Sequence, residues 1–162
     1  MWTFSSRAAE SGRKEIMKIL VINGPNLNFL GIRDTGVYGT VNYDGLVKMI
    51  EEYAGNKGIE VECFQSNHEG AIIDRLQKAY SDGTGGIVIN PGAYAHYSIA
   101  IRDALDSYHT VPKIEVHISD IKAREEFRHV SVTELVCDGS VVGHGLNGYL
   151  EAMDMALEKS GT

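Results

Sequence analysis

An arginine and a tyrosine share a glycine-rich stretch near the start of the chain. The stretch is "GPNLNFLGIRDTGVYGTVN", and it carries Arg33 and Tyr38. A tyrosine has an ordinary pKa of about 10, so it is a poor base near neutral pH. A nearby guanidinium favours the phenolate and lowers that pKa. The pair could therefore form a general base when the stretch closes over a site. The alternative is that Arg33 lies in solvent and Tyr38 packs the loop against the protein.

A second set of polar side chains interrupts a strand pattern later in the chain. In "PKIEVHISD", isoleucine and valine alternate with Glu115, His117 and Ser119, so these three polar residues share one face of a strand. In an open antiparallel sheet such a face would meet water. In a parallel sheet it would be buried, and each unpaired polar group would cost about 1–3 kcal/mol. The polar face then needs bonding partners or a function.

The elements that must position these residues follow a regular alternation from Lys18 onward. We predict strands over 18–24, 59–66, 85–92 and 113–119, with further strand material at 133–137 and 140–145. We predict helices over 43–58, 69–83, 98–108, 122–129 and 148–159, with Ser98 as an N-cap and Gly58 as a stop. Alternating strands and helices predict an α/β domain with a parallel sheet covered on both faces.

The strand ends share one kind of composition. After four successive strands come Asn23-Gly24-Pro25-Asn26, Ser66-Asn67-His68-Glu69, Asn90-Pro91-Gly92 with His96, and His117 with Ser119. Each set alone is a turn signal. Because ligands of open α/β sheets bind beyond the carboxyl ends of the strands, the four sets together predict a pocket at that edge.

Several kinds of chemistry lack their motifs. The sequence has neither a Gly-x-x-x-x-Gly-Lys-Ser/Thr loop nor a Gly-x-Gly-x-x-Gly after the first strand, and it lacks a Gly-x-Ser-x-Gly elbow. His68, His96 and His117 do not have the spacing of a metal site on a helix. No lysine stands at the carboxyl end of a strand. We therefore expect no nucleotide, metal or other cofactor and find no evident covalent nucleophile, while a lysine that forms a Schiff base remains an alternative.

Composition sets the broad class. The 162 residues, 43% of them hydrophobic, suit one domain over 17–162, preceded by a polar extension over 1–16 that we leave out of the fold. The net charge of -7 does not favour binding to nucleic acid or to an anionic membrane, and no apolar run approaches the roughly 20 residues of a membrane span. Cys63 and Cys137 lie far apart in the sequence, so we expect reduced thiols and a cytoplasmic setting.

Five stretches of the sequence resemble one family. They are "INGPNLNFLGIRDTGVYG", "QSNHEGAIIDRLQKAY", "INPGAYAHYSIAIRDAL", "IEVHISDIKAREEFRH" and "VVGHGLNGYLEAM". They are similar to the type II 3-dehydroquinate dehydratases, in that family's order and spacing. The resemblance implies a flavodoxin-like three-layer sandwich with a five-stranded parallel sheet. It also implies a lyase of the shikimate pathway, which leads to the aromatic amino acids. The family converts 3-dehydroquinate to 3-dehydroshikimate without metal or Schiff base, usually as a homododecamer.

The resemblance also implies roles for single residues. Tyr38 matches the base and Arg33 the lid arginine, while Asn26 matches the residue that positions a water against the enolate. His117 matches the general acid, which Glu115 orients and charges. Arg124 matches an arginine near Tyr38. The residues that match substrate-holding positions are Asn90, His96, Ile118, Ser119 and Arg128. Asp103 matches an acidic residue that enters the site of a neighbouring subunit.

A few residues differ from the family's usual pattern. Asp120 stands where asparagine is usual, Lys122 replaces a common histidine, and Gly36 replaces a more rigid lid residue. These changes affect expected rate and affinity more than the reaction. Two other hypotheses remain at this point: a binding module for flavin or phosphate with the same fold, and a related lyase for another hydroxylated ring acid. A receiver-type signalling domain fits less well, because the first strand ends in Asn-Gly-Pro.

Overall fold

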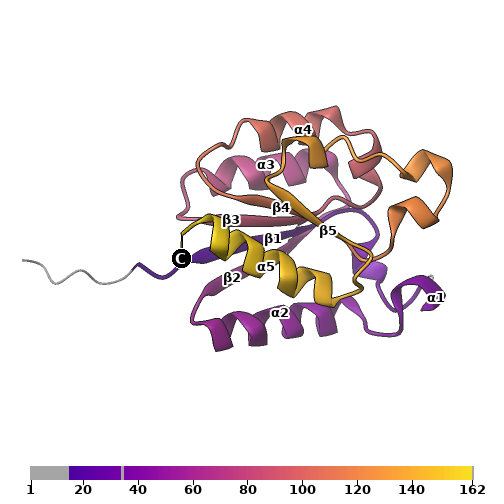
Figure 1. The fold of residues 1–162 in the computed structure, drawn as a ribbon, viewed down its shortest axis with the longest axis horizontal. Helices are drawn as coiled ribbons and strands as arrows, with labels where there is room; N and C mark the ends of the chain where they lie inside the picture. Colours follow the sequence, from indigo (N-terminus) through magenta and orange to yellow (C-terminus); the bar gives the residue numbers. More distant parts are fainter. Residues whose placement is uncertain (1–14, 34, 162) are drawn as a thin grey trace, which may run out of the picture.

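Five parallel strands form the central sheet (Figure 1). The computed structural model describes residues 15–33 and 35–161. The strands are β1 (Lys18–Asn23), β2 (Glu60–Gln65), β3 (Gly86–Asn90), β4 (Lys113–His117) and β5 (Gly139–Val142). They lie in the order β2-β1-β3-β4-β5, which is the flavodoxin-like arrangement. The predicted parallel α/β sheet is therefore confirmed.

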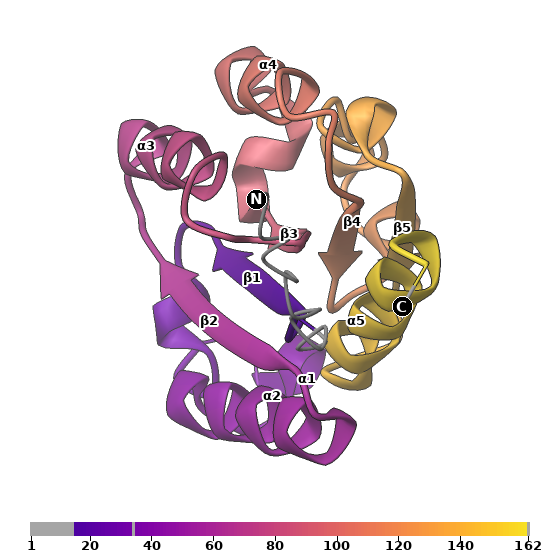
Figure 2. The ribbon, with the colours of Figure 1, turned by 90° about the vertical axis from the view of Figure 1, so that its left-hand side faces the viewer.

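Helices cover both faces of the sheet, as the view in Figure 2 shows. The helices α2 (Tyr43–Lys57) and α5 (Asn147–Lys159) lie on one face, and α3 (Glu69–Ala79) and α4 (Ile99–Asp106) lie on the other. A short helix, α1 (Thr35–Tyr38), stands apart from these layers. No helix in the described residues is long and apolar enough to cross a membrane.

The inner strands β1 and β3 are largely apolar on both faces because both of their faces are buried. In β1, Ile19 and Val21 pack toward α2 and α5, whereas Leu20 and Ile22 pack toward α3 and α4. All four side chains have no exposed surface. This continuous apolar pattern is typical of a strand inside a parallel sheet.

Two helix boundaries follow the predicted capping residues. The side chain of Ser98 accepts a hydrogen bond from the N–H of Ile101 at the start of α4. Gly58 ends α2 in the left-handed conformation, with φ of 67°. Both predictions are confirmed.

The predicted helix over 122–129 is wrong. The segment forms two separate 3₁₀ turns, Ile121–Ala123 and Glu126–Arg128, and Arg124 between them is extended, with φ of -105° and ψ of -164°. The segment contains good helix formers, but Phe127 is 68% exposed and the sequence offers no apolar stripe to bury. A stretch this short gains too little from propensity alone to remain helical.

The strand material predicted at 133–137 is also wrong. Residues Glu134–Val136 form a 3₁₀ turn with local backbone bonds, such as that from the N–H of Cys137 to the carbonyl of Glu134. The last strand is β5 alone. Thr133, just before this turn, donates a hydrogen bond to Glu115 of β4, and Val136 and Cys137 pack against the core on the side of α3 and α4.

Candidate active site

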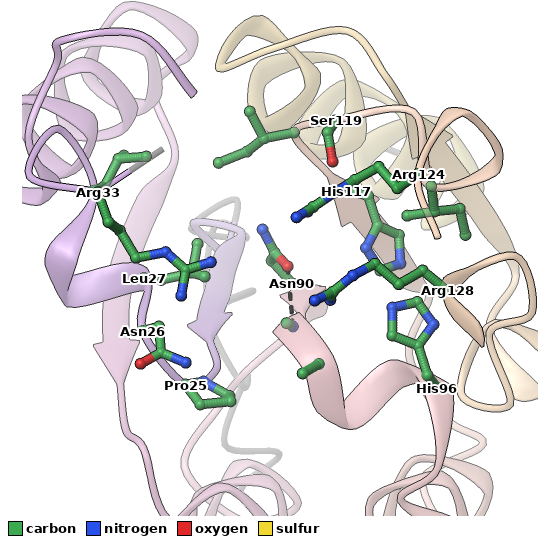
Figure 3. A pocket seen from close by; sticks show the side chains of 15 residues that line it. Pro25, Asn26, Leu27, Arg33, Asn90, His96, His117, Ser119, Arg124 and Arg128 are labelled. Carbon is green, nitrogen blue, oxygen red and sulfur yellow. Dashed lines mark hydrogen bonds between the residues drawn. The ribbon is translucent and has the colours of Figure 1, made fainter. Parts of the chain in front are cut away.

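A pocket lies at the carboxyl ends of β1, β3 and β4 (Figure 3). This position is the topological switch point of the sheet, because β2 lies on one side of β1 and β3, the next strand in the chain, lies on the other side. The residues that line it are Pro25, Asn26, Leu27, Leu30, Arg33, Asn90, Gly92, Ala93, His96, His117, Ile118, Ser119, Ile121, Arg124 and Arg128. The predicted convergence of polar strand ends is therefore observed for three of the four strands named.

His117 is held from behind by a buried carboxylate. Its Nε2 lies 2.8 Å from Oε2 of Glu115, and Glu115 has no exposed surface. A carboxylate accepts hydrogen bonds, so Nε2 carries a hydrogen and Nδ1 is the nitrogen left to exchange a proton with a ligand. The arrangement suits a histidine that works as a general acid.

His96 lies beside His117 with a different bonding partner. The two rings are stacked, with centroids 6.3 Å apart and planes at 22°. Nδ1 of His96 donates to the carbonyl oxygen of Val130 at 2.8 Å, which leaves Nε2 as an acceptor. Burial lowers the pKa of His96, and the charges of His117 and Arg128 act in the same direction. A neutral His96 can accept a hydrogen bond from a ligand hydroxyl.

Three arginines give the pocket a positive character. Figure 3 shows Arg33 extending from one side of the pocket and Arg124 and Arg128 from the other. None of the described lining residues is acidic. Glu125 lies just outside, where its Oε2 accepts from Nε of Arg128 at 2.8 Å. The pocket therefore suits an anionic ligand although the chain as a whole is acidic.

Asn26 is placed by an unusual backbone conformation. It has φ of 67°, a left-handed value that asparagine tolerates better than most residues. Its N–H donates to Oδ1 of Asn67 at 3.0 Å, so the loops after β1 and β2 are bonded to each other. The side chain of Gln65 donates to the same oxygen at 3.1 Å. Asn26 thereby enters the pocket from a fixed turn.

A chain of buried hydrogen bonds orients Asn90. Its Nδ2 donates to the hydroxyl of Tyr149 at 2.9 Å, and that hydroxyl donates to Oδ1 of Asn23 at 2.6 Å. Oδ1 of Asn90 accepts from the N–H of Gly92 at 3.1 Å. Both ends of the Asn90 amide are thus fixed by the protein, and Tyr149 has no exposed surface.

The structure brings most of the predicted residues together. Those that line the pocket are Asn26, Arg33, Asn90, His96, His117, Ile118, Ser119, Arg124 and Arg128. Glu115 lies directly behind His117. Tyr38 is the last residue of α1, and its side chain falls outside what the structure describes. Asp103 lies on α4, with its side chain 68% exposed, and does not line the pocket of its own chain. Residues 1–14 of the predicted extension also fall outside the described part.

Sequence reasoning missed the residues that hold the site in place. Ser131 and Thr133 both donate hydroxyl hydrogen bonds to Glu115, and Tyr149 bonds Asn90. No motif marks them, since each contact joins elements far apart in the chain. The one available signal was the polar face of the 113–119 strand, which required partners. Asp120, noted as a departure, accepts from the N–H of Lys122 at 3.0 Å and is not among the lining residues.

Comparison with known sequences identifies the family. The profile of the dehydroquinase class II family matches residues 17–157. The chain belongs to the class II dehydroquinase family. A 3-dehydroquinate dehydratase of Lachnospira eligens is 63% identical over 147 residues, which cover 88% of this chain and 100% of that protein. The region that the family profile matches begins at Met17.

Solved structures of class II dehydroquinases agree with the fold. The type II dehydroquinase of Butyrivibrio crossotus has 68% sequence identity and a TM-score of 0.86, and the match covers 87% of this chain and 97% of that one. The type II dehydroquinase of Propionibacterium acnes has 45% identity and a TM-score of 0.81, with 88% and 99% covered. The family named from sequence motifs is therefore confirmed.

Proposed function

We propose that this class II dehydroquinase removes water from 3-dehydroquinate to give 3-dehydroshikimate, a step of the shikimate pathway. One observation carries the proposal. Three guanidinium groups surround a histidine backed by a buried carboxylate, in a pocket whose described lining contains no acidic side chain. A hydroxylated ring acid that also has a ketone, as 3-dehydroquinate does, carries the carboxylate, hydroxyl groups and ketone that such a pocket would bind. The relatives named 3-dehydroquinate dehydratase supply the particular ring acid.

The first step is removal of a proton from the carbon beside the ketone. Tyr38 acts as the base, in its phenolate form. Arg33 and Arg124 favour that form because positive charge stabilises the anion. The electron pair left by the proton moves toward the ketone oxygen and gives an enolate. Asn26, held in its left-handed turn, positions a water that donates to this oxygen.

The second step is loss of the hydroxyl group. His117 gives its proton to the departing oxygen, which leaves as water, and the enolate collapses to a conjugated enone. Tyr38 has gained one proton and His117 has lost one, so one proton must return to His117 before the next turnover. Glu115 stabilises the imidazolium form through the contact of 2.8 Å.

The remaining pocket residues hold the substrate. Ser119 and the backbone at Ile118 bind the carboxylate, and Arg128 reaches the ring hydroxyls. Neutral His96 accepts from a hydroxyl, which agrees with its lowered pKa. Asn90 presents an amide that Tyr149 and Gly92 already orient, so little conformational freedom is lost on binding.

We propose that the reaction uses neither a metal nor an imine. In the part of the chain that the structure describes, no group of three His, Cys, Asp or Glu side chains is placed to hold a metal ion. The described residues that line the pocket include no lysine. Activity should therefore survive a chelator, and it should survive borohydride added with substrate. Inactivation by borohydride only in the presence of substrate would indicate an imine instead.

We also propose assembly into a homododecamer in the cytoplasm. The side chain of Asp103 on α4 is 68% exposed. A residue that enters a neighbour's pocket must be exposed in this way in the separate subunit. Tyr97 follows His96 in the chain, and the carbonyl of Val130 accepts from Nδ1 of His96, so these two exposed apolar residues adjoin a pocket residue and would be buried by a neighbour. The free thiols Cys63 and Cys137 suit a reducing compartment.

A sizing column gives the subunit number. Asp103→Asn should lose activity at unchanged size, with the exposed Asp106→Asn as control.

The experiment that tests the function follows the conjugated product in the near ultraviolet. Purified protein and 3-dehydroquinate should give a rising enone absorbance, and a panel of related hydroxylated ring acids should not. Turnover of a different ring acid alone would favour a related lyase. A flat trace with every substrate, from folded protein of the expected assembly, would overturn the proposal.

A further inference from the structure

Two buried hydroxyl groups close on the carboxylate of Glu115. Ser131 Oγ donates to Oε2 at 2.6 Å, and Thr133 Oγ1 donates to Oε1. Ser131 is 6% exposed and Thr133 is fully buried, so water does not compete for these bonds. Ser131 and His117 contact Oε2 and Thr133 donates to Oε1, so each oxygen of the carboxylate has at least one donor. A buried carboxylate without such donors would be costly.

The chemical type of these partners matters. A hydroxyl donates a hydrogen bond to an ionised carboxylate and so favours the ionised form, but it brings no positive charge. An arginine or lysine in the same place would neutralise Glu115. With Ser131 and Thr133 as partners, the negative charge of Glu115 stays available to the imidazolium of His117.

The same short segment also fixes the second histidine. The carbonyl of Val130 accepts from Nδ1 of His96 at 2.8 Å, and the N–H of Val132 donates to the carbonyl of Ala95 at 2.8 Å. Residues 130–133 therefore bond both pocket histidines, one directly and one through Glu115. None of these four residues lines the pocket, so they act through other groups.

We propose that Ser131 and Thr133 are positioning residues, which hold the carboxylate of Glu115 aimed at His117 so that its negative charge supports the acid role of His117. The inference deepens the proposed function and rests on it for the role of His117 as acid. Other charged or titratable groups also face this pair. On the pocket side they are His96, Arg124 and Arg128. On the other side the thiol of Cys137 lies near Glu115, and the charges of Lys113, Asp138 and Glu134 also act on that thiol.

The test uses Ser131→Ala, Thr133→Val and the double variant. Valine keeps the shape of threonine and has a methyl group in place of the hydroxyl. The pH at which His117 loses its proton is followed by NMR of its ring nitrogens in the resting protein. We expect that pH to fall by about one unit in the double variant, which corresponds to about a tenfold change in the protonation equilibrium. The basic limb of the kcat profile should move by the same amount, while KM changes less than twofold.

Two controls separate positioning from a general structural effect. Ser140 pairs with Glu115 in the register of β5 and β4, but its hydroxyl donates to Glu134 at 2.7 Å, so Ser140→Ala should leave the titration unchanged. Thr133→Ser keeps a hydroxyl donor at this position, so His117 should titrate in this variant as it does in the wild type. If the double variant does not fold, the single variants carry the test with half the shift. An unchanged His117 titration in folded Ser131→Ala and Thr133→Val would overturn the proposal.

The two readouts also separate this inference from the function itself. The NMR titration needs no substrate. A protein that fails to convert 3-dehydroquinate would overturn the proposed function, whereas the response of His117 to the loss of the two hydroxyls would still decide what Ser131 and Thr133 do.

Discussion

Nε2 of His117 and Oε2 of Glu115 are 2.8 Å apart, and the carboxylate that makes this contact is completely buried. The two residues stand on the same face of β4, with Val116 between them on the other. A strand holds such a pair in fixed relation because side chains alternate along it. The pocket therefore contains one histidine whose orientation and charge depend on its own strand.

Glu115→Gln should lower kcat by about 100-fold or more, because a neutral amide cannot stabilise the imidazolium of His117. Glutamine keeps the size of the side chain, so KM should change less. The measurement is the initial rate of enone formation across pH. Glu158→Gln, at an exposed glutamate of α5, is the control. A Glu115→Gln enzyme with the wild-type rate and pH profile would contradict the role given to Glu115.

Tyr149→Phe should raise KM and destabilise the fold. The hydroxyl of Tyr149 joins Asn90 to Asn23, and its removal leaves a buried donor and a buried acceptor unpaired. We expect a loss of about 1–3 kcal/mol in the free energy of unfolding, measured in urea.

Tyr108→Phe is a matched control for this variant. The hydroxyl of Tyr108 is also buried, but it donates to the carbonyls of Ala79 and Thr84, away from the pocket. The Tyr108→Phe variant should have a lower free energy of unfolding and an unchanged KM. If Tyr149→Phe and Tyr108→Phe lose stability alike and neither changes KM, then Tyr149 does not orient Asn90.

His96 makes stability depend on pH in a known direction. Burial holds its pKa in the folded protein below the ordinary value of about 6.5, which the unfolded chain retains. As pH falls through 6.5, the unfolded chain therefore takes up a proton first, and the free energy of unfolding decreases until the folded ring also titrates. Above pH 6.5 the contribution of His96 is fully present.

The measurement compares urea unfolding at pH 7.5 and pH 5.5. His96→Gln should show a smaller loss of stability on acidification than the wild type, because it lacks this titration. His109→Gln, at an exposed histidine, should behave as the wild type does. A His96→Gln protein that loses as much stability as the wild type between the two pH values would show that His96 is not responsible.

Gly24→Ala should distort the backbone next to Pro25, which lines the pocket. A Cβ at Gly24 would lie 2.3 Å from the backbone oxygen of Pro91, where the ends of β1 and β3 meet. The backbone must move to relieve that contact, at a cost of about 1–3 kcal/mol, and substrate affinity should fall with it. In Gly55→Ala a Cβ would meet nothing within 4 Å on α2, so this control should be stabilised by up to about 1 kcal/mol. Equal stability of the two variants would refute the argument.

Sequence reasoning found the fold because the sheet is buried on both faces. Apolar runs such as Lys18–Asn23 are then continuous, and the capping residues Ser98 and Gly58 mark helix ends through local bonds. The prediction of a helix over 122–129 is wrong for the opposite reason. Its residues favour a helix, but Arg124 and Arg128 reach the pocket from two 3₁₀ turns, and tertiary contacts outweigh local propensity.

The pocket could be predicted only in part. Strand ends converge at one edge of a parallel sheet, so Asn26, Asn90 and His117 were expected to meet. The residues that hold them were not. Thr133 reaches Glu115 and Tyr149 reaches Asn90 through side-chain contacts between distant elements, and no local pattern in a single sequence specifies such contacts.

The most direct test of the acid role of His117 is the rate of enone formation from 3-dehydroquinate by His117→Ala, compared with His109→Ala at the opposite end of the sheet. That role predicts that His117→Ala loses about 100-fold or more of kcat while it remains folded, and that His109→Ala keeps the wild-type rate. A His117→Ala protein that forms the enone within twofold of the wild-type rate would contradict it.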